Sequence, residues 1–233
     1  MLEGKEMISS EEKVEQFGFD LVHSVLSNEK VSSMISLLEE TKVMPRKGGI
    51  REIDKIIPEV AEFANSKLLL SLASRYLAGN PFLVRAIYFN KSQKNNWLVT
   101  WHQDKTVTVS NKMELDGWGP WTLKANVHHV QPPLEVLEKM VTIRVHLDKT
   151  TKDNGCLKVA PGSHKQDLLA TSDVLNKIQN IDPFFCEVEA GDAVVMRPHI
   201  VHSSEKAKTI ENRRILHFEY SCFELPEGMS WVA

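Results

Sequence analysis

The stretch Trp97-Leu98-Val99-Thr100-Trp101-His102-Gln103-Asp104 decides how this chain is interpreted. Its β-branched and aromatic residues are typical of a strand. On a strand, residues two positions apart face the same side, so His102 and Asp104 can reach one metal ion. A His-x-Asp triplet also arises by chance, and the alternative is a buried histidine that a neighbouring carboxylate satisfies.

Two further histidines lie later in the chain and could complete a metal site. A predicted strand, Ala193–Met196, ends at Pro198, and His199 and His202 follow it. Either could be the third ligand, and His202 is favoured because a hairpin could bring Arg213 back beside the metal. Two imidazoles and one carboxylate occupy one face of a metal octahedron. The other face stays free for a cosubstrate and O₂, which is the pattern of non-haem Fe(II) oxygenases.

The doublet Arg213-Arg214 supplies a candidate anion site. An arginine inside a barrel needs an anion, and a bidentate pair with a carboxylate satisfies it. Ser204 could add a hydroxyl donor to the same carboxylate. The alternatives are surface charge for the arginines, which we expect for one of them, and an ordinary loop serine.

Length and composition indicate a single ordinary globular domain. The chain has 233 residues, 42% hydrophobic and 25% charged, with a net charge of −3, so no nucleic-acid footprint is expected. Cys156, Cys186 and Cys222 are too widely spaced for a zinc ribbon or a disulfide framework. Neither a membrane span nor a signal-peptide core is apparent, so we expect a cytoplasmic protein with no membrane partner. The sequence does not indicate an oligomeric state.

The pattern of the chain changes near Pro81. Residues 1–80 predict a mostly helical support layer, including a capping box at Ser9 and Glu12 and one helix from Pro58 to about Leu77. Residues 81–233 predict short strands at close spacing, with a helix around 172–179. The expected fold is mainly β with N-terminal and flanking helices, in the form of a barrel or jelly roll.

Residues 111–138 are expected to form a long insertion, and loops of this length are often lids or binding loops. Trp118 and Trp121 could cover an apolar substrate, or could anchor the loop to the barrel. The adjacent His128 and His129 point apart, so we expect substrate-loop or surface residues rather than metal ligands. On the predicted strand 140–147, Arg144 faces either the cavity or solvent.

At these residues the chain resembles the phytanoyl-CoA dioxygenase family of Fe(II)/2-oxoglutarate-dependent oxygenases, over nearly its whole length. The resemblance is carried by the segments Phe17-Gly18-Phe19-Asp20-Leu21-Val22, Trp101-His102-Gln103-Asp104, Asn154-Gly155, Ala160-Pro161-Gly162-Ser163-His164-Lys165 and Pro198…His202…Arg213. It implies a double-stranded β-helix, that is, a cupin-like jelly roll. Asn154-Gly155 predicts a tight hairpin turn, and His164 is interpreted as a scaffold residue.

The resemblance implies His102, Asp104 and His202 as iron ligands and catalytic centre. It implies Arg213, with Ser204, as the clamp on the distal carboxylate of 2-oxoglutarate, and Arg214 would face the other way. Lys91 resembles a family lysine upstream of the His-Gln-Asp motif and is a weaker candidate for anion contact. Arg144 departs from the family, in which a tryptophan near the cosubstrate is common.

The expected activity is hydroxylation of a small molecule by Fe(II), 2-oxoglutarate and O₂, with release of succinate and CO₂. Asp104 favours hydroxylation, because related halogenases lack the carboxylate ligand. One alternative is a non-catalytic jelly roll that binds metal and 2-oxoglutarate. A zinc-dependent hydrolase is another, although zinc would not need the carboxylate clamp and no further glutamate stands out as a base. The family name is not taken to identify the substrate.

Overall fold

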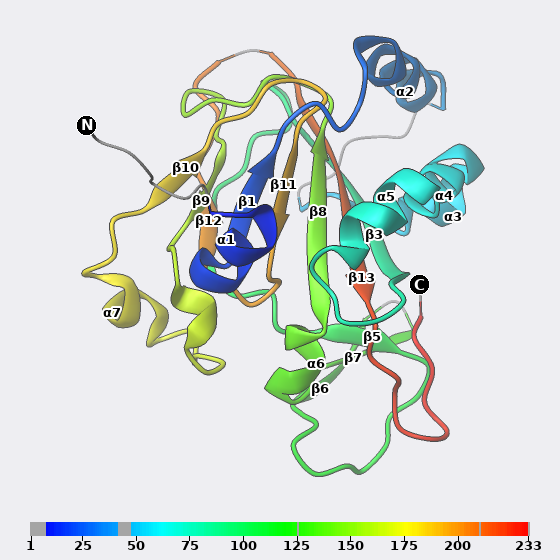
Figure 1. The fold of residues 1–233 in the computed structure, drawn as a ribbon, viewed down its shortest axis with the longest axis vertical. Coiled ribbons are helices and arrows are strands. Elements are labelled where there is room, and N and C mark those ends of the chain that lie inside the picture. The colour runs from blue at the N-terminus through cyan, green and yellow to red at the C-terminus, as the bar shows by residue number, and fades with distance from the viewer. Residues whose placement is uncertain (1–7, 42–47, 125, 210, 233) are drawn as a thin grey trace.

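The computed structural model describes residues 8–41, 48–124, 126–209 and 211–232 (Figure 1). Its strands form antiparallel sheets, and the largest has six strands in the order β1-β11-β8-β13-β3-β2. These strands are Phe19–Val22, Ala193–Met196, Met140–His146, Arg213–Ser221, Phe82–Lys91 and Ile50–Arg51. The N-terminal third of the chain therefore contributes two strands, β1 and β2, as well as helices.

A second sheet completes the jelly roll. Its order is β10-β9-β12-β4, and its strands are Phe184–Cys186, Leu157–Val159, His202–Ser204 and Val99–His102. One cavity is lined by residues of both sheets, so it lies between them. The prediction of a mainly β, double-stranded β-helix with N-terminal and flanking helices is confirmed.

Helices from the first third of the chain cover the outer face of the six-stranded sheet (Figure 1). They are α1 (Ser10–Phe17), α2 (Asn28–Glu40), α3 (Ile53–Ile56), α4 (Pro58–Ala64) and α5 (Lys67–Ser74). The capping box at Ser9 and Glu12 is present at the start of α1. Shorter helices, α6 (Leu134–Glu138), η1 (Ser163–Lys165) and α7 (Val174–Ile178), connect strands further along the chain.

The expected single helix from Pro58 to about Leu77 is wrong, because the structure has two. Asn65 ends α4, and the Ser66 side chain accepts a hydrogen bond from the backbone N–H of Leu69. A serine that satisfies a free N–H in this way begins a new helix. The break lets α4 and α5 pack separately against the sheet.

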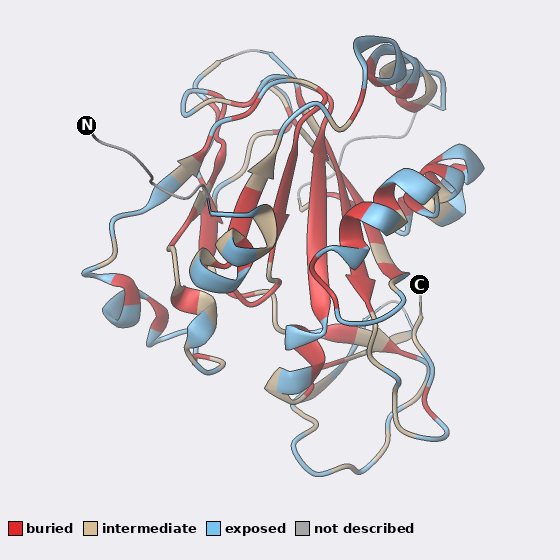
Figure 2. Cartoon of the chain, in the orientation of Figure 1, coloured by how far each residue is buried: buried red, intermediate tan, exposed pale blue. Residues whose placement is uncertain are grey.

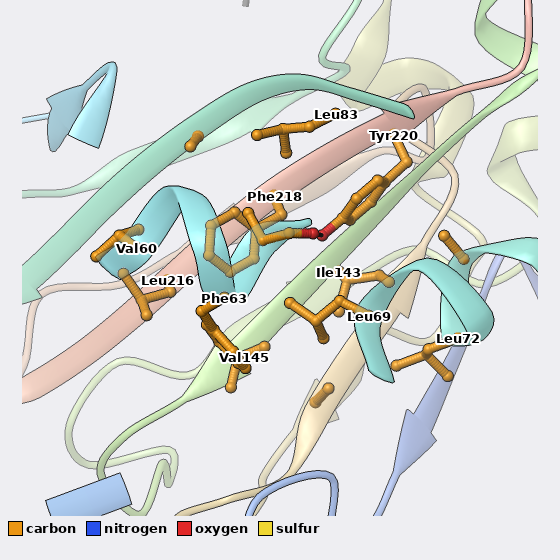
Figure 3. Packing of buried hydrophobic residues seen from close by; sticks show 14 of the residues in the cluster. Val60, Phe63, Leu69, Leu72, Leu83, Ile143, Val145, Leu216, Phe218 and Tyr220 are labelled. Atoms are coloured by element: carbon orange, nitrogen blue, oxygen red, sulfur yellow. Dashed lines mark hydrogen bonds between the residues drawn. The ribbon is translucent and has the colours of Figure 1, made fainter. Parts of the chain in front are cut away.

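The main core lies between these helices and the six-stranded sheet. Alternate residues of β8 and β13 point into it, among them Ile143 and Phe218, where they meet Phe63 of α4 and Leu69 of α5 (Figure 3). Both faces of the central strands are buried, while the helices expose their outer faces (Figure 2). The sheet thus has an apolar outer face, and its inner face is available for a site.

The expected long loop over residues 111–138 is structured in its second half, while residues 111–120 form no helix or strand. It contains the hairpin β6 (Trp121–Lys124) and β7 (Val127–Val130), followed by α6. Strand β7 also pairs with β5 (Val107–Val109), which makes a third sheet in the order β5-β7-β6. Alternating apolar residues explain the strands, because Val107, Val109 and Val130 share a buried cluster. No described helix has the length and apolar character needed to cross a membrane.

Candidate functional site

His102, Asp104 and His202 converge at one point of the cavity. One ligand atom from each lies within 4.8 Å of the other two. Each histidine Nε2 is 3.5 Å from a different oxygen of the Asp104 carboxylate. Of the described residues, these three form the only such group of histidine, cysteine and acidic side chains. Two imidazole nitrogens and a carboxylate are a donor set that suits divalent iron.

Strand pairing brings these residues together and sets the orientation of the imidazole rings. His202 of β12 pairs directly with His102 of β4, and the backbone N–H of Asp104 donates to the carbonyl of Pro198. Each ring Nδ1 lies next to a carbonyl two residues earlier, at 2.8 Å from Thr100 for His102 and 2.9 Å from Ile200 for His202. A Nδ1–H that donates to a carbonyl leaves Nε2 free for a metal, as metal-binding histidines commonly do.

Electrostatics favour the metal-binding forms of Asp104 and His202, but not that of His102. Burial would lower the pKa of the His102 imidazole, yet the hydrogen bond with Asp104 and the charge of that carboxylate raise it. Burial would raise the pKa of the Asp104 carboxyl, but the hydrogen bond with His102 and the positive charges of the two histidines lower it well below its usual range. Burial lowers the pKa of His202 to about 4. A neutral imidazole and an ionised carboxylate are the forms that bind metal.

The other histidine candidate, His199, lies outside this group. Its ring is buried near that of His164, with ring centroids 6.3 Å apart, and its carbonyl accepts a hydrogen bond from the Gln103 side chain at 2.9 Å. The histidine that the spacing favoured, His202, is therefore the one beside His102. His164 lies in η1 with Nε2 3.1 Å from the carbonyl of Glu15, as a scaffold residue would.

Arg213 enters the same cavity with its charge uncompensated. It is 2% exposed, Nη1 donates to the carbonyl of Gly155 at 2.6 Å, and Nε has no hydrogen-bond partner among the described residues. Burial lowers its pKa to about 9, with a further contribution from the charge of Arg144. A buried guanidinium with a free donor needs an anion. The geometry suits a carboxylate ligand.

The predicted Asn154-Gly155 turn positions this arginine. Gly155 has a φ of +75°, and a Cβ at this residue would lie 2.4 Å from the carbonyl oxygen of Glu205. Only glycine fits such a close approach in this conformation. The turn presents the Gly155 carbonyl to both Arg213 and Ser204.

Ser204 and Lys91 lie beside Arg213. The Ser204 hydroxyl donates to the Gly155 carbonyl at 2.9 Å and accepts from Lys91 Nζ at 2.7 Å. Its proton is therefore already engaged. Lys91 is fully buried, and burial, followed by the charges of Arg213 and Arg144, lowers its pKa to about 7. Lys91 is not among the residues that line the cavity.

Arg214 points to the opposite face of β13, as strand alternation predicts. It forms two hydrogen bonds to the Asp148 carboxylate through Nε and Nη2, at 2.9 and 2.8 Å, and a third to Glu39 at 2.6 Å. Arg214 is thus paired with two carboxylates, whereas Arg213 is paired with none among the described residues.

Arg144 faces the cavity, which resolves its two possible orientations. Its Nη1 is 2.8 Å from His217 Nδ1, and its guanidinium lies 5.3 Å from the centre of the Phe89 ring. Burial lowers its pKa to about 10, while the charge of Asp104 opposes that shift. Its Nε is buried without a hydrogen-bond partner among the described residues. Arg144 can therefore contact an anionic ligand near the metal group.

Sequence reasoning missed a hydrogen-bonded chain on β13. A guanidinium only donates, so His217 Nδ1 accepts from Arg144, and its Nε2 donates to Glu219 at 3.1 Å. Glu219 also accepts from Arg85 at 3.0 Å. His217 and Glu219 lie four and six residues after Arg213, so continuing the strand alternation would have identified them.

The cavity has a volume of about 250 Å³ and combines basic and apolar walls. His129 lines it, whereas His128 does not and instead meets the Trp121 ring edge-on. Trp118 and Trp121 do not line it either. Both pack against the buried cluster that contains Val107, and Trp121 Nε1 donates to the Trp118 carbonyl at 3.2 Å. In this structure the tryptophans anchor the insertion, and an apolar wall missed from sequence includes Trp97 and Phe89.

Comparison with known proteins agrees with the resemblance found in the sequence. The profile of the phytanoyl-CoA dioxygenase (PhyH) family matches residues 14–215. The non-haem α-ketoglutarate-dependent carbocyclase SnoK from nogalamycin biosynthesis superposes with a TM-score of 0.70 at 16% identity, covering 94% of this chain and 84% of its own. The epimerase SnoN, in complex with Fe³⁺, α-ketoglutarate and nogalamycin RO, gives 0.71 at 16%, covering 91% and 82%.

A third similar structure is HygX from Streptomyces hygroscopicus with nickel, 2-oxoglutarate and hygromycin B bound. It superposes with a TM-score of 0.65 at 17% identity, covering 89% of this chain and 84% of its own. A search of curated proteins gave no match. At these identities the superpositions show a shared fold.

Proposed function

Because this chain belongs to the phytanoyl-CoA dioxygenase family, we propose that it is a non-haem Fe(II)/2-oxoglutarate-dependent dioxygenase. In this proposal it hydroxylates a small-molecule substrate and releases succinate and CO₂. The observation that carries the proposal is one cavity in which His102, Asp104 and His202 converge and Arg213 presents a buried, unpaired guanidinium.

The residues fit both groups that this activity requires. His102, Asp104 and His202 would hold Fe(II), leaving coordination positions for the cosubstrate and O₂. Arg213 would hold the distal carboxylate of 2-oxoglutarate through its free Nε and its remaining guanidinium donors. SnoN and HygX have the same fold, and their structures hold a metal with α-ketoglutarate or 2-oxoglutarate, which supports this assignment.

Bound Fe(II) and 2-oxoglutarate would supply the oxidising chemistry, and the chain's residues supply position and environment. The Thr100 and Ile200 carbonyls orient the two imidazoles. Arg144 adds positive charge beside the metal group, held in place by His217. The Gly155 carbonyl holds Arg213 at the cavity. The Ser204 hydroxyl bonds that carbonyl and Lys91, so it would not donate to the cosubstrate.

The reaction outcome is the finer part of the proposal. SnoK is named a carbocyclase and SnoN an epimerase, so this fold supports reactions other than hydroxylation. We propose hydroxylation rather than halogenation because Asp104 would supply a third protein ligand, which related halogenases lack. The partner is a small molecule, as in the complexes of SnoN with nogalamycin RO and of HygX with hygromycin B. Three free cysteines suit a reducing compartment, and we propose the cytoplasm.

Metal and cosubstrate binding test the proposal before any substrate is known. His102→Ala and Asp104→Ala should each lower iron content and abolish calorimetric binding of 2-oxoglutarate, with His128→Ala as the control outside the metal group. The losses should exceed the ~10–100-fold typical of residues that only orient a ligand. Unchanged iron and 2-oxoglutarate binding in both variants would contradict the proposal.

Product analysis then separates the remaining functions. A substrate screen that follows succinate and a product 16 mass units heavier would identify a hydroxylase, since one oxygen atom is added. Tight 2-oxoglutarate binding without succinate release from any substrate would favour a non-catalytic binding protein. Turnover with zinc and without 2-oxoglutarate would favour a hydrolase.

A further inference from the structure

Basic side chains gather at the outer part of the cavity, away from the metal group. Arg51 and Lys124 are exposed, and His129 is half-buried. They come from separate elements: Arg51 from β2, Lys124 from the end of β6 and His129 from β7. Burial lowers the pKa of His129, and the positive charges of Arg85, Lys124 and Arg51 lower it further. These three residues therefore line one cavity, within range of one another's charge.

The cavity has an excess of positive charge. Five arginine and lysine residues line it, whereas only two carboxylates of the described residues do, those of Asp104 and Glu219. Glu219 pairs with Arg85 at 3.0 Å. Arg51, Lys124 and Arg144 form no ion pair with any described residue. A divalent metal and a dianionic cosubstrate cancel each other, so the cavity remains positive after both bind.

The strand register shows how this outer group is related to the metal group. Arg51 pairs with Ile87, Ile87 with His217, and His217 with Arg144. All four residues line the cavity, so they form one row across neighbouring strands. Adjacent strands lie about 4.8 Å apart, which places the Arg51 and Arg144 backbones roughly 14 Å apart. The charge of Asp104 acts on both Arg144 and His217, so these two residues form the end of the row nearer the metal group.

The part of this row next to Arg51 is apolar, and His217 separates it from Arg144. Ile87 follows Arg51 in the row, and Phe89, Val99 and Leu157 line the same cavity. A ligand along the row would place carbon atoms over this wall and an anionic group near Arg51 and Lys124.

We propose that the substrate is a compact molecule with an apolar body and one carboxylate or phosphate group. Arg51 and Lys124 bind the anionic group, with His129 beside them, and thereby direct the other end of the molecule to the metal. This inference rests on the proposed function and specifies the substrate class. Arg51 and Lys124 are specificity-determining residues in this view.

Binding of three probes to the nickel-loaded protein with 2-oxoglutarate tests the inference. The probes are hexanoate, hexyl phosphate and the neutral hexanamide, compared by calorimetry. We expect at least one anion to bind about tenfold more tightly than hexanamide, and the stronger anion identifies the group. Added salt should weaken binding of the anion and leave hexanamide unaffected.

Charge-neutralising variants locate the anion. Arg51→Gln and Lys124→Gln should each weaken binding of the favoured anion about threefold to tenfold, and the double variant should weaken it more. Lys177→Gln, which removes an exposed charge on α7 outside the cavity, is the matched control and should bind like the wild type.

Two results would overturn the inference: neither anion binds better than hexanamide, or both single variants bind the favoured anion as the wild type does. Failure of the proposed function has a different signature. In that case 2-oxoglutarate itself does not bind to the nickel-loaded wild type. If 2-oxoglutarate binds and the probes do not discriminate, only the substrate assignment is wrong.

Discussion

The two faces of strands β8 and β13 are both buried, yet they have opposite chemistry. The outer face meets the helices with apolar side chains: Val141, Ile143, Val145, Leu216, Phe218 and Tyr220. The inner face carries ionisable ones: Arg144, His146, Arg213, His217 and Glu219. A single pair of strands thus builds the core on one side and the candidate site on the other.

The difference shows that burial serves two purposes in this fold. On the outer face it removes apolar surface from water and stabilises the protein. On the inner face, Arg144, Arg213 and Lys91 are desolvated with no carboxylate paired to them among the described residues. Desolvated charges cost free energy until a counter-ion arrives. We therefore expect changes on the outer face to affect folding, and changes on the inner face to affect binding.

Phe218→Ala should give the largest loss of stability. The Phe218 side chain is fully buried and packs edge-on against Phe63 at 5.9 Å between ring centroids. Removing it should lower the free energy of unfolding by about 3–5 kcal/mol, because a cavity replaces the ring. Urea unfolding measures this. At low temperature the folded variant should still bind 2-oxoglutarate about as tightly as the wild type. Leu123→Ala is the control, since Leu123 is 60% exposed.

Arg213→Met should separate the two faces most clearly, because its effects have opposite signs. Removing the unpaired buried charge should raise the free energy of unfolding of the ligand-free protein by about 1–4 kcal/mol. The same change should weaken 2-oxoglutarate binding by about 2–5 kcal/mol, since the carboxylate loses its charged partner. Thermal unfolding and calorimetry of one preparation measure both.

The neighbouring Arg214→Met is the matched control. It removes the arginine that pairs with Asp148 and Glu39 on the opposite face of β13, so it should lower stability and leave 2-oxoglutarate binding unchanged. If both variants shifted stability in the same direction, the contrast between the two faces would be wrong.

From the sequence, we could predict only those features of the inner face that depend on residues close together in the chain. His102 and Asp104 meet as expected, although β4 ends at His102 and Asp104 lies just beyond it. A turn is present at Asn154-Gly155, but it is not the expected hairpin, because the strands on either side, β8 and β9, belong to different sheets. Alternation along β13 also separated Arg213 from Arg214. Continued by two more steps, it would have placed His217 and Glu219 in the cavity.

Other features depended on contacts that local patterns do not encode. Arg51 lines the cavity because the short strand β2 pairs with β3. The two strands lie far apart in the sequence, so no local pattern predicts that they pair. Trp118 and Trp121 could equally cover a site or fill a core, and only the packing of the β6–β7 hairpin decides between these roles. The break between α4 and α5 depends on one side-chain hydrogen bond at Ser66.

The pH dependence of stability should reveal Lys91 on the inner face. Burial lowers its pKa to about 7 in the folded protein, against about 10.4 for an exposed lysine. Below pH 7 both states hold the proton and the folded state carries the full desolvation cost. Above pH 7 the folded state has lost the proton, so its stability rises with pH. Between pH 7 and 8.5 the wild type should gain at most about 1.4 kcal/mol per pH unit relative to Lys91→Met.

Urea unfolding at a series of pH values, compared between the wild type and Lys91→Met, isolates this contribution. Measurements stop at pH 8.5 because burial lowers the pKa of Arg213 to about 9. A difference between the two proteins that stays constant across this range would show that Lys91 keeps its proton and has found a counter-charge.

The smallest expected effects come from two hydroxyl groups on opposite faces of the sheet. Tyr220 on the outer face donates to the carbonyl of Ala64 at 2.6 Å, whereas the buried hydroxyl of Thr142 on the inner face has no partner among the described residues. Tyr220→Phe should lower the free energy of unfolding by about 1 kcal/mol, because it breaks a hydrogen bond. Thr142→Val should be neutral or stabilising by a similar amount, because it removes an unsatisfied polar group of nearly the same shape. A destabilising Thr142→Val, measured by the same urea titration, would mean that this hydroxyl has a partner, such as an ordered water molecule, and that the inner face is better satisfied than its protein contacts indicate.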